Sequence, residues 1–167
     1  MILIGGGSRC GKSRAALDML RAAGERRAFI ATAQPFDDEM STRIAWHRAE
    51  RAPDIVTFEE PFDVAVRIRI EESRYDAIVV DCLTLWLSNL MLAERDSIPQ
   101  DCRELVESAT ASRAEVILVT NEVGCGIVPE SALARRFRDE AGRLNQLAAQ
   151  YAREVHWMVF GIGMRIK

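Results

Sequence analysis

Residues 6–13 read Gly-Gly-Ser-Arg-Cys-Gly-Lys-Ser and follow, after Gly5, an apolar run, residues 1–4, that is typical of a strand. They fit the phosphate-binding pattern G-x-x-x-x-G-K-[S/T], in which glycines let successive backbone N–H groups point inward around a phosphate. A helix that begins near Gly11 adds the positive end of its dipole to that cradle. In this pattern Lys12 reaches the β- and γ-phosphates, and Ser13 holds magnesium. The segment therefore predicts a nucleoside triphosphate as ligand, although a glycine-rich turn can match by chance. The residues expected to bind phosphate are Gly6, Gly7, Ser8, Arg9, Cys10, Gly11, Lys12 and Ser13.

Short apolar runs alternate with helical patterns along the chain, which is typical of βαβ units and a mainly parallel sheet. Strands are expected near residues 1–5, 27–32, 54–58, 75–81, 115–120 and 154–160. Helices are expected over residues 12–23, 37–51, 62–73, 83–93, 100–113 and 129–153. The predicted fold class is α/β: a three-layer, RecA-like P-loop NTPase fold with a mainly parallel central sheet. Because the chain has 167 residues and no linker-like tract, we expect a single P-loop nucleotide-binding domain over residues 1–167.

Composition narrows the classes of partner. A net charge of −3 and a pI near 5.5 give no broad electrostatic footprint for nucleic acid, so a small-molecule substrate is expected. The four cysteines have no C-x-x-C spacing, which argues against a zinc site and against a disulfide framework. No signal-like start and no apolar run of about 18 residues is present, so we expect a cytoplasmic protein with no membrane span.

An apolar strand, residues 75–80, ends in a carboxylate, Asp81. Magnesium prefers oxygen ligands and keeps several waters, so Asp81 and the Ser13 hydroxyl, together with phosphates, suffice to hold it. An aspartate at this position can also be a helix cap before Leu83.

The segment 37–51 carries a cationic pattern. On a continuous helix, Arg43, His47 and Arg51 recur every four residues and share one face, with Arg48 beside them. Arginines bind phosphate oxygens, and a neutral imidazole can attack phosphorus, so nucleotidyl transfer is chemically available. The alternative is a solvated charged face paired with Glu39 and Glu50. The second histidine, His156, lies in an apolar strand and is expected to be structural.

Two further polar segments follow the fifth expected strand. Asn121 and Glu122 lie beyond its carboxyl end, where ligand sites of open parallel sheets are found. The residues 135–146 form a strongly polar helix, which can be an exposed or subunit-facing surface or can bind substrate. The sequence leaves both segments open between substrate binding and subunit contact.

Taken together, these segments resemble the bifunctional adenosylcobinamide kinase/adenosylcobinamide-phosphate guanylyltransferase family of cobalamin biosynthesis, the CobU/CobP family. The resemblance extends over essentially the whole chain. It is carried by residues 6–13, 30–33, 37–44, His47, 120–129, 137–146, 161–163 and Lys167.

The resemblance implies two reactions. ATP or GTP first phosphorylates the hydroxyl of adenosylcobinamide in the presence of Mg²⁺. GTP then gives GMP to an enzyme histidine, and the phosphorylated cobinamide takes it to yield adenosylcobinamide-GDP. The resemblance implies His47 as the residue that carries GMP, beside the catalytic Lys12, and a homo-oligomer, specifically a trimer. The other residues implied to bind nucleotide are Ala31, Thr32, Ala33, Arg48, Ala49, Glu50, Arg51, Glu59 and Asp81.

Two alternatives from other classes remain open. A plain P-loop small-molecule kinase needs residues 6–13 and Asp81 but not His47. A nucleotide-gated binding module binds GTP without consuming it.

Overall fold

The computed structural model describes residues 1–35, 37–49 and 51–167 and, within them, all side chains except those of Arg43 and His47. The described strands form one seven-stranded sheet in the order β3-β2-β4-β5-β1-β6-β7. Every neighbouring pair is parallel except β6 and β7. The strands are β1 Ile2–Gly6, β2 Arg27–Ala31, β3 Ile55–Glu59, β4 Ala77–Asp81, β5 Glu115–Val119, β6 Glu154–Val159 and β7 Ile162–Arg165. The helices are α1 Lys12–Ala23, α2 Asp38–Ala49, α3 Val64–Glu71, α4 Leu83–Leu92, α5 Ile98–Ala111 and α6 Ala132–Tyr151.

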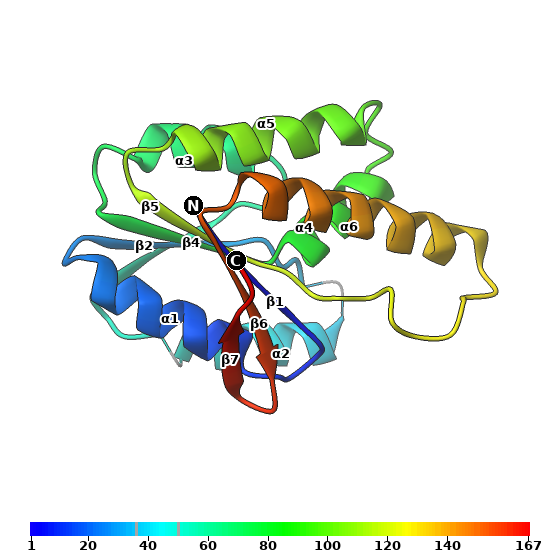
Figure 1. The fold of residues 1–167 in the computed structure, drawn as a ribbon, viewed down its shortest axis with the longest axis horizontal. Coiled ribbons are helices and arrows are strands. Elements are labelled where there is room, and N and C mark those ends of the chain that lie inside the picture. The colour runs from blue at the N-terminus through cyan, green and yellow to red at the C-terminus, as the bar shows by residue number, and fades with distance from the viewer. Residues whose placement is uncertain (36, 50) are drawn as a thin grey trace.

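Helices cover both faces of the sheet, which gives three layers. Helix α1 lies on one face, and α3, α4, α5 and α6 lie on the other (Figure 1). Alternate residues of each central strand point to opposite faces, as the period of two requires. In β1, Leu3 therefore contacts the four-helix side and Ile4 contacts the α1 side. The predicted α/β fold with a mainly parallel sheet is confirmed.

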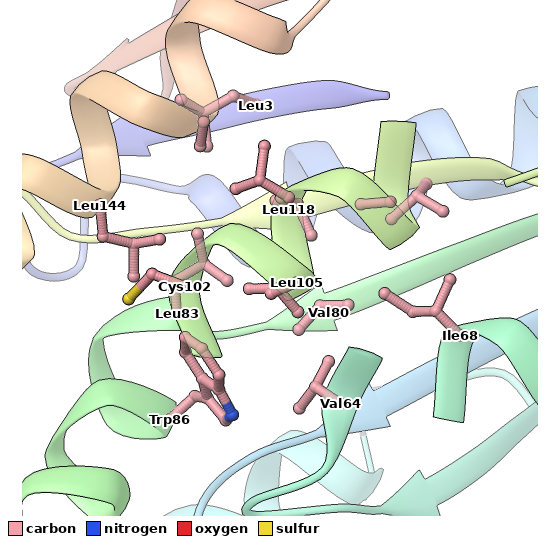
Figure 2. Close-up of a cluster of buried hydrophobic side chains, with 14 of the residues drawn as sticks. Leu3, Val64, Ile68, Val80, Leu83, Trp86, Cys102, Leu105, Leu118 and Leu144 are labelled. Atoms are coloured by element: carbon pink, nitrogen blue, oxygen red, sulfur yellow. The ribbon is translucent and has the colours of Figure 1, made fainter. Parts of the chain in front are cut away.

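The larger core lies between the sheet and the four-helix layer. Figure 2 shows Trp86 and Leu83 of α4 beside Leu105 of α5, over strand residues such as Val80 and Leu118. The Trp86 indole N–H donates to the backbone oxygen of Phe62 at 2.7 Å, so its one polar atom is satisfied while the residue is 2% exposed. This layer holds the carboxyl ends of β4 and β5 in fixed positions.

The six predicted strands and six predicted helices are all present, with small shifts at their ends. Strand β7 was not predicted, because Gly161 and Gly163 interrupt the apolar pattern and glycine is depleted in strands. The helix predicted over residues 37–51 ends at Ala49 as α2. Helix α5 begins at Ile98, earlier than predicted, with Pro99 in its first turn.

The topology brings three strand ends together. Strand β5 lies between β1 and β4, and Val119 is the register partner of both Ile4 and Asp81. The loop after β1, the carboxylate that ends β4 and the segment after β5 therefore meet at one edge of the sheet, where ligands of open α/β folds bind. None of the helices in the described part of the chain combines the length and the hydropathy needed to cross a bilayer.

Candidate functional site

The loop after β1 needs glycine at two positions. Gly6 has φ +151°, and a Cβ there would lie 2.6 Å from the backbone oxygen of Met158 on the neighbouring strand. Gly11 is the N-cap of α1 with φ +98°, and a Cβ would lie 3.2 Å from the Cα of Gly161. The turn between β6 and β7 also supports the loop, since the Gly161 N–H donates to the Cys10 oxygen at 3.0 Å. The loop is therefore held tightly against its neighbours, as a rigid phosphate cradle requires.

Lys12, the first residue of α1, is only 7% exposed. Its Nζ donates to the Gly7 oxygen at 2.5 Å and contacts the Cys10 sulfur at 3.6 Å. The ammonium group is thus held inside the loop at the amino end of α1. The lysine charge and the helix dipole add there, so the position favours an anion.

Ser13 and Asp81 meet across the sheet edge. The Ser13 hydroxyl donates to Asp81 Oδ2 at 2.7 Å. A hydroxyl and a carboxylate oxygen this close, beside a phosphate loop, are the donor set that magnesium takes together with phosphates and waters. The described residues contain no cluster of three or more His, Cys, Asp or Glu side chains that could hold a metal by themselves.

A cleft of about 1550 Å³ opens at this edge. Its walls come from the phosphate loop, the end of β2, α2, the end of β4, the segment after β5 and the β6–β7 turn. The predicted site residues that line it are Ser8, Arg9, Cys10, Gly11, Lys12, Ser13, Ala31, Ala33, Arg48, Arg51, Glu59 and Asp81. Among the described residues, the predicted Gly6, Gly7, Thr32 and Ala49 are not part of the lining. The predicted Glu50 lies outside the described residues.

Thr32 occupies a structural position rather than a place on the cleft wall. Its side chain is fully buried, and its hydroxyl donates to the Cys82 oxygen and accepts from the Cys82 N–H, both at 2.8 Å. Burial, assisted by the Asp81 charge, raises the pKa of the Cys82 thiol to about 11, so the thiol is neutral at pH 7. Thr32 thereby ties the end of β2 to the residue that follows Asp81.

Arg48, within α2, and Arg51, beyond its end, have different surroundings. Arg48 forms an ion pair with Glu59 at 3.4 Å, with both side chains more than 60% exposed. The Arg51 guanidinium lies 3.8 Å from the centroid of the Phe29 ring and donates to the Thr57 hydroxyl at 3.3 Å. Burial lowers the pKa of Arg51, and Asp81 acts in the opposite direction, but an arginine stays charged. Both arginines place positive charge on the cleft wall.

The predicted common face of Arg43, His47 and Arg51 does not form along one helix. Helix α2 ends at Ala49, so Arg51 lies beyond it and turns toward Phe29. The side chains of Arg43 and His47 lie outside the described part of the structure. The backbone of His47 is within α2, and its two neighbours, Trp46 and Arg48, line the cleft.

The structure adds cleft residues that the sequence reasoning did not assign. Among them are Trp46 and the exposed Phe160 of the β6–β7 turn. Asn121 and Glu122, which the sequence left open between substrate binding and subunit contact, also line the cleft. Within the described residues, the polar segment 135–146 contributes nothing to the lining. Trp46 precedes the candidate histidine, and that adjacency was the available signal. No sequence signal identified Phe160, because strand β7, and with it the β6–β7 turn, was not predicted.

Comparison with known proteins identifies related sequences over the whole chain. Residues 2–166 match the model of a family described as cobinamide kinase / cobinamide phosphate guanyltransferase. The bifunctional adenosylcobalamin biosynthesis protein CobP of Pseudomonas aeruginosa is 43% identical over 99% of this chain and 96% of its own length. The bifunctional proteins CobU of Escherichia coli and Salmonella typhimurium are 39% and 41% identical, over 100% of this chain and 99% of theirs.

Solved structures with much lower identity share the fold. The RadB recombinase aligns with a TM-score of 0.55 at 16% identity, over 93% of this chain and 72% of its own. A second solved structure, that of an ATPase domain, aligns with a TM-score of 0.51 at 13% identity, over 93% of this chain and 68% of its own. These likenesses establish a RecA-like P-loop architecture and nothing about the substrate.

Proposed function

The chain belongs to the cobinamide kinase / cobinamide phosphate guanyltransferase family, and we propose that both of its reactions use the cleft at the carboxyl edge of the sheet. Its activities are phosphorylation of cobinamide and guanylyl transfer to the phosphorylated product. The observation that carries the proposal is that Trp46 and Arg48, on either side of His47, line the same cleft as Lys12 and Ser13. A cleft of about 1550 Å³ exceeds the ~300–1,000 Å³ of ordinary small-ligand pockets, which suits a nucleotide beside a bulky corrinoid.

In the kinase step, the phosphate loop binds the triphosphate of ATP or GTP. Backbone N–H groups of residues 6–13 hold the phosphates, and the Lys12 ammonium neutralises negative charge that spreads over the transferred group. The hydroxyl oxygen of adenosylcobinamide forms a bond to the γ-phosphorus, and the bond from that phosphorus to the bridging oxygen breaks. The nucleoside diphosphate leaves with the bond electrons.

Mg²⁺ fits the oxygens of Ser13 and Asp81 and is the cofactor that we assign to this position. When bound, it neutralises phosphate charge and orients the leaving group. Removal of the carboxylate in Asp81→Ala should raise the Mg²⁺ concentration needed for half-maximal kinase activity. An unchanged metal titration would remove Asp81 from this role.

In the guanylyl-transfer step, we assign the nucleophile to His47. Its neutral imidazole nitrogen forms a bond to the α-phosphorus of GTP, and pyrophosphate leaves. The nearby positive charges of Arg48 and Arg51 stabilise the pyrophosphate as it departs. Phosphorylated cobinamide then attacks the same phosphorus, the P–N bond breaks, and adenosylcobinamide-GDP forms. The nucleotide contacts that we propose for Ala31, Ala33, Glu50 and Glu59 belong to the same step.

Incubation with GTP labelled at the α-phosphorus, without corrinoid, tests the reaction and the residue together. Label should stay on the denatured protein, survive alkali and be lost in acid, as a phosphoramidate does. His47→Ala should abolish labelling and spare cobinamide phosphorylation, because the phosphate loop does not need the imidazole.

The other histidine gives a matched control. His156 lies in β6, with its Nε2 3.2 Å from Glu154 Oε2, away from the cleft lining. His156→Ala should keep full labelling. Label mapped to His156, or undiminished in His47→Ala, would refute the assignment. Cobinamide phosphorylation with no label in the wild type would favour a plain kinase.

We further propose that residues 1–167 act as one domain in a cytoplasmic homo-oligomer, a trimer. Ile127, Val128 and Leu133 support an interface after β5, since all three are more than half exposed in the single chain. Sedimentation equilibrium should give three times the 18.7 kDa chain mass. A monomer at micromolar concentration would overturn the proposal.

A further inference from the structure

One carboxylate of the cleft has no role in the reactions described above. Glu122 follows β5, the strand between the phosphate-loop strand β1 and the strand β4 that ends in Asp81. Its backbone N–H donates to the oxygen of Gly6 at 3.1 Å, which fixes it beside the first residue of the phosphate loop. Glu122 lines the cleft and is partly buried. Its backbone is therefore placed next to the loop that binds the phosphates.

The other carboxylates that line the cleft are engaged or distant from the loop. Asp81 accepts from the Ser13 hydroxyl and belongs to the magnesium position. Glu59 is paired with Arg48. Glu39 is exposed in the first turn of α2, where a carboxylate stabilises the helix dipole. Among the described carboxylates of the lining, Glu122 is the one anchored to the phosphate loop and neither ion-paired nor bonded to Ser13.

The Glu122 side chain has a defined position. Its Oε1 accepts from the Gly124 N–H at 2.5 Å, while its Oε2 has no hydrogen-bond or ion-pair partner among the described residues. A Cβ on Gly124 would lie 2.7 Å from Oε1, so the contact requires glycine at position 124. One oxygen is therefore held by the loop, and the other is available to a ligand in the cleft.

Hydrogen bonds from two helices hold the backbone that carries Glu122. The Asn121 N–H donates to the Thr84 hydroxyl of α4 at 2.8 Å. Asn145 of α6 accepts from the Thr120 hydroxyl at 2.7 Å and donates to the Asn121 oxygen at 3.3 Å. The polar segment of α6 thus acts on the cleft indirectly, through residues 120 and 121.

We propose that Glu122 is the general base of the kinase step, a role that rests on the proposed function of the cleft. The Glu122 Oε2 accepts a hydrogen bond from the alcohol of the corrinoid and orients its oxygen toward the γ-phosphorus. As the new O–P bond forms and the bond to the nucleoside diphosphate breaks, the hydroxyl proton passes to the Glu122 carboxylate. The proton then leaves to water, which regenerates the base. A general base positioned in this way typically accelerates the reaction by about 10²- to 10⁴-fold.

The test compares Glu122→Gln with a matched variant, Glu130→Gln, in the full-length enzyme with adenosylcobinamide, ATP and Mg²⁺. Glu130 is exposed in the same loop and lies outside the cleft lining. Glu122→Gln should lower kcat of phosphorylation by about 10²-fold or more with little change in the KM for ATP, since the amide keeps the shape and loses the proton acceptor. Glu130→Gln should match the wild type. GMP labelling by GTP reports that the variants are folded and bind nucleotide.

Gly124→Ala gives a second, independent readout. The added methyl displaces the far end of a flexible side chain rather than backbone, so folding should be kept while the carboxylate moves. Its kcat for phosphorylation should fall by about 10-fold or more, with GMP labelling retained. If the wild type phosphorylates cobinamide and Glu122→Gln does so with a similar kcat, the role of Glu122 as general base is overturned and the proposed function stands. A wild-type enzyme that phosphorylates no cobinamide would instead overturn the proposed function.

Discussion

Helices α2 and α4 both border the cleft, but they are held in opposite ways. In α4, Leu83, Trp86, Leu87 and Leu90 are at most 2% exposed and belong to the larger core. Figure 2 shows two of them, Leu83 and Trp86. In α2, none of the described side chains is buried, and Trp46 is 72% exposed. The helix that follows Asp81 is thus part of the framework, whereas the helix that carries His47 lies on its surface.

The residues proposed for the two reactions therefore lie in regions of different rigidity. The phosphate loop, Asp81 and Glu122 lie at the ends of buried parallel strands, where packing fixes their positions. The nucleophile that we assign to GMP transfer lies on a helix whose attachment uses few buried apolar side chains, and such segments open at low free-energy cost. Changes in the framework should therefore lower stability, and changes in α2 should affect ligands more than folding.

The largest effect on stability is expected from Leu87→Ala. Leu87 is fully buried in the core beneath α4, so its truncation leaves a cavity that the surrounding core fills only in part. The free energy of unfolding should fall by about 2–5 kcal/mol. Urea denaturation followed by circular dichroism measures it. A loss below about 1 kcal/mol would mean that α4 is not the framework described here.

The next largest effect is on rate rather than on folding. Lys12→Ala should lower the kcat of cobinamide phosphorylation by about 10²- to 10³-fold, because one preorganised positive donor to the transferred phosphate is lost. The kinetic assay is paired with a urea denaturation curve, whose midpoint should stay near that of the wild type. Near-normal phosphorylation would remove the phosphate-loop assignment.

A smaller effect is expected at the edge of the sheet opposite the cleft. The pKa of Asp76 is lowered from 3.8 to about 2, mainly by the hydrogen bond from the Arg26 side chain and next by that from the Arg26 backbone N–H. A carboxyl whose pKa is depressed by folding stabilises the protein above the unfolded pKa, and this contribution is lost as pH falls from about 4 toward 2. Asp76→Asn should lower the free energy of unfolding at pH 7, and the difference from the wild type should shrink below about pH 4. A difference that stays the same across this acidic range would contradict the pairing of Asp76 with the Arg26 guanidinium.

The smallest effect on stability is expected from Trp46→Ala in α2. The indole is largely exposed, and substitutions at such positions usually change stability by less than about 0.5 kcal/mol. The same urea experiment used for Leu87→Ala measures both variants. A loss above about 2 kcal/mol would show that α2 is anchored as firmly as α4 and would end the comparison.

The parts that the sequence predicted well are those set by local pattern. The strand–loop–helix around Lys12 and the carboxylate that ends β4 follow from short motifs, and the contact between Ser13 and Asp81 follows from the parallel topology. The alternation of strands and helices predicted the fold because each element carries its own period.

The parts that were missed depend on contacts between distant residues. Arg51 leaves the expected helical face because its guanidinium lies over Phe29, which comes from another strand. Thr32 is buried because Cys82, 50 residues away, offers both a donor and an acceptor. Glu122 becomes distinctive only when its neighbours in the cleft are seen to be engaged. No local pattern carries these facts.

The different exposure of the tryptophans gives this enzyme an optical signal of its own. The sequence has three, of which Trp86 is buried, Trp157 is partly buried in β6 and Trp46 is exposed at the cleft. An indole in water emits at longer wavelength than a buried one and is reached first by a dissolved quencher such as iodide. We therefore expect the long-wavelength, iodide-sensitive part of the emission to come mainly from Trp46, one residue before the assigned nucleophile. A ligand that fills the cleft shields this indole, so its arrival can be followed by fluorescence without any added label.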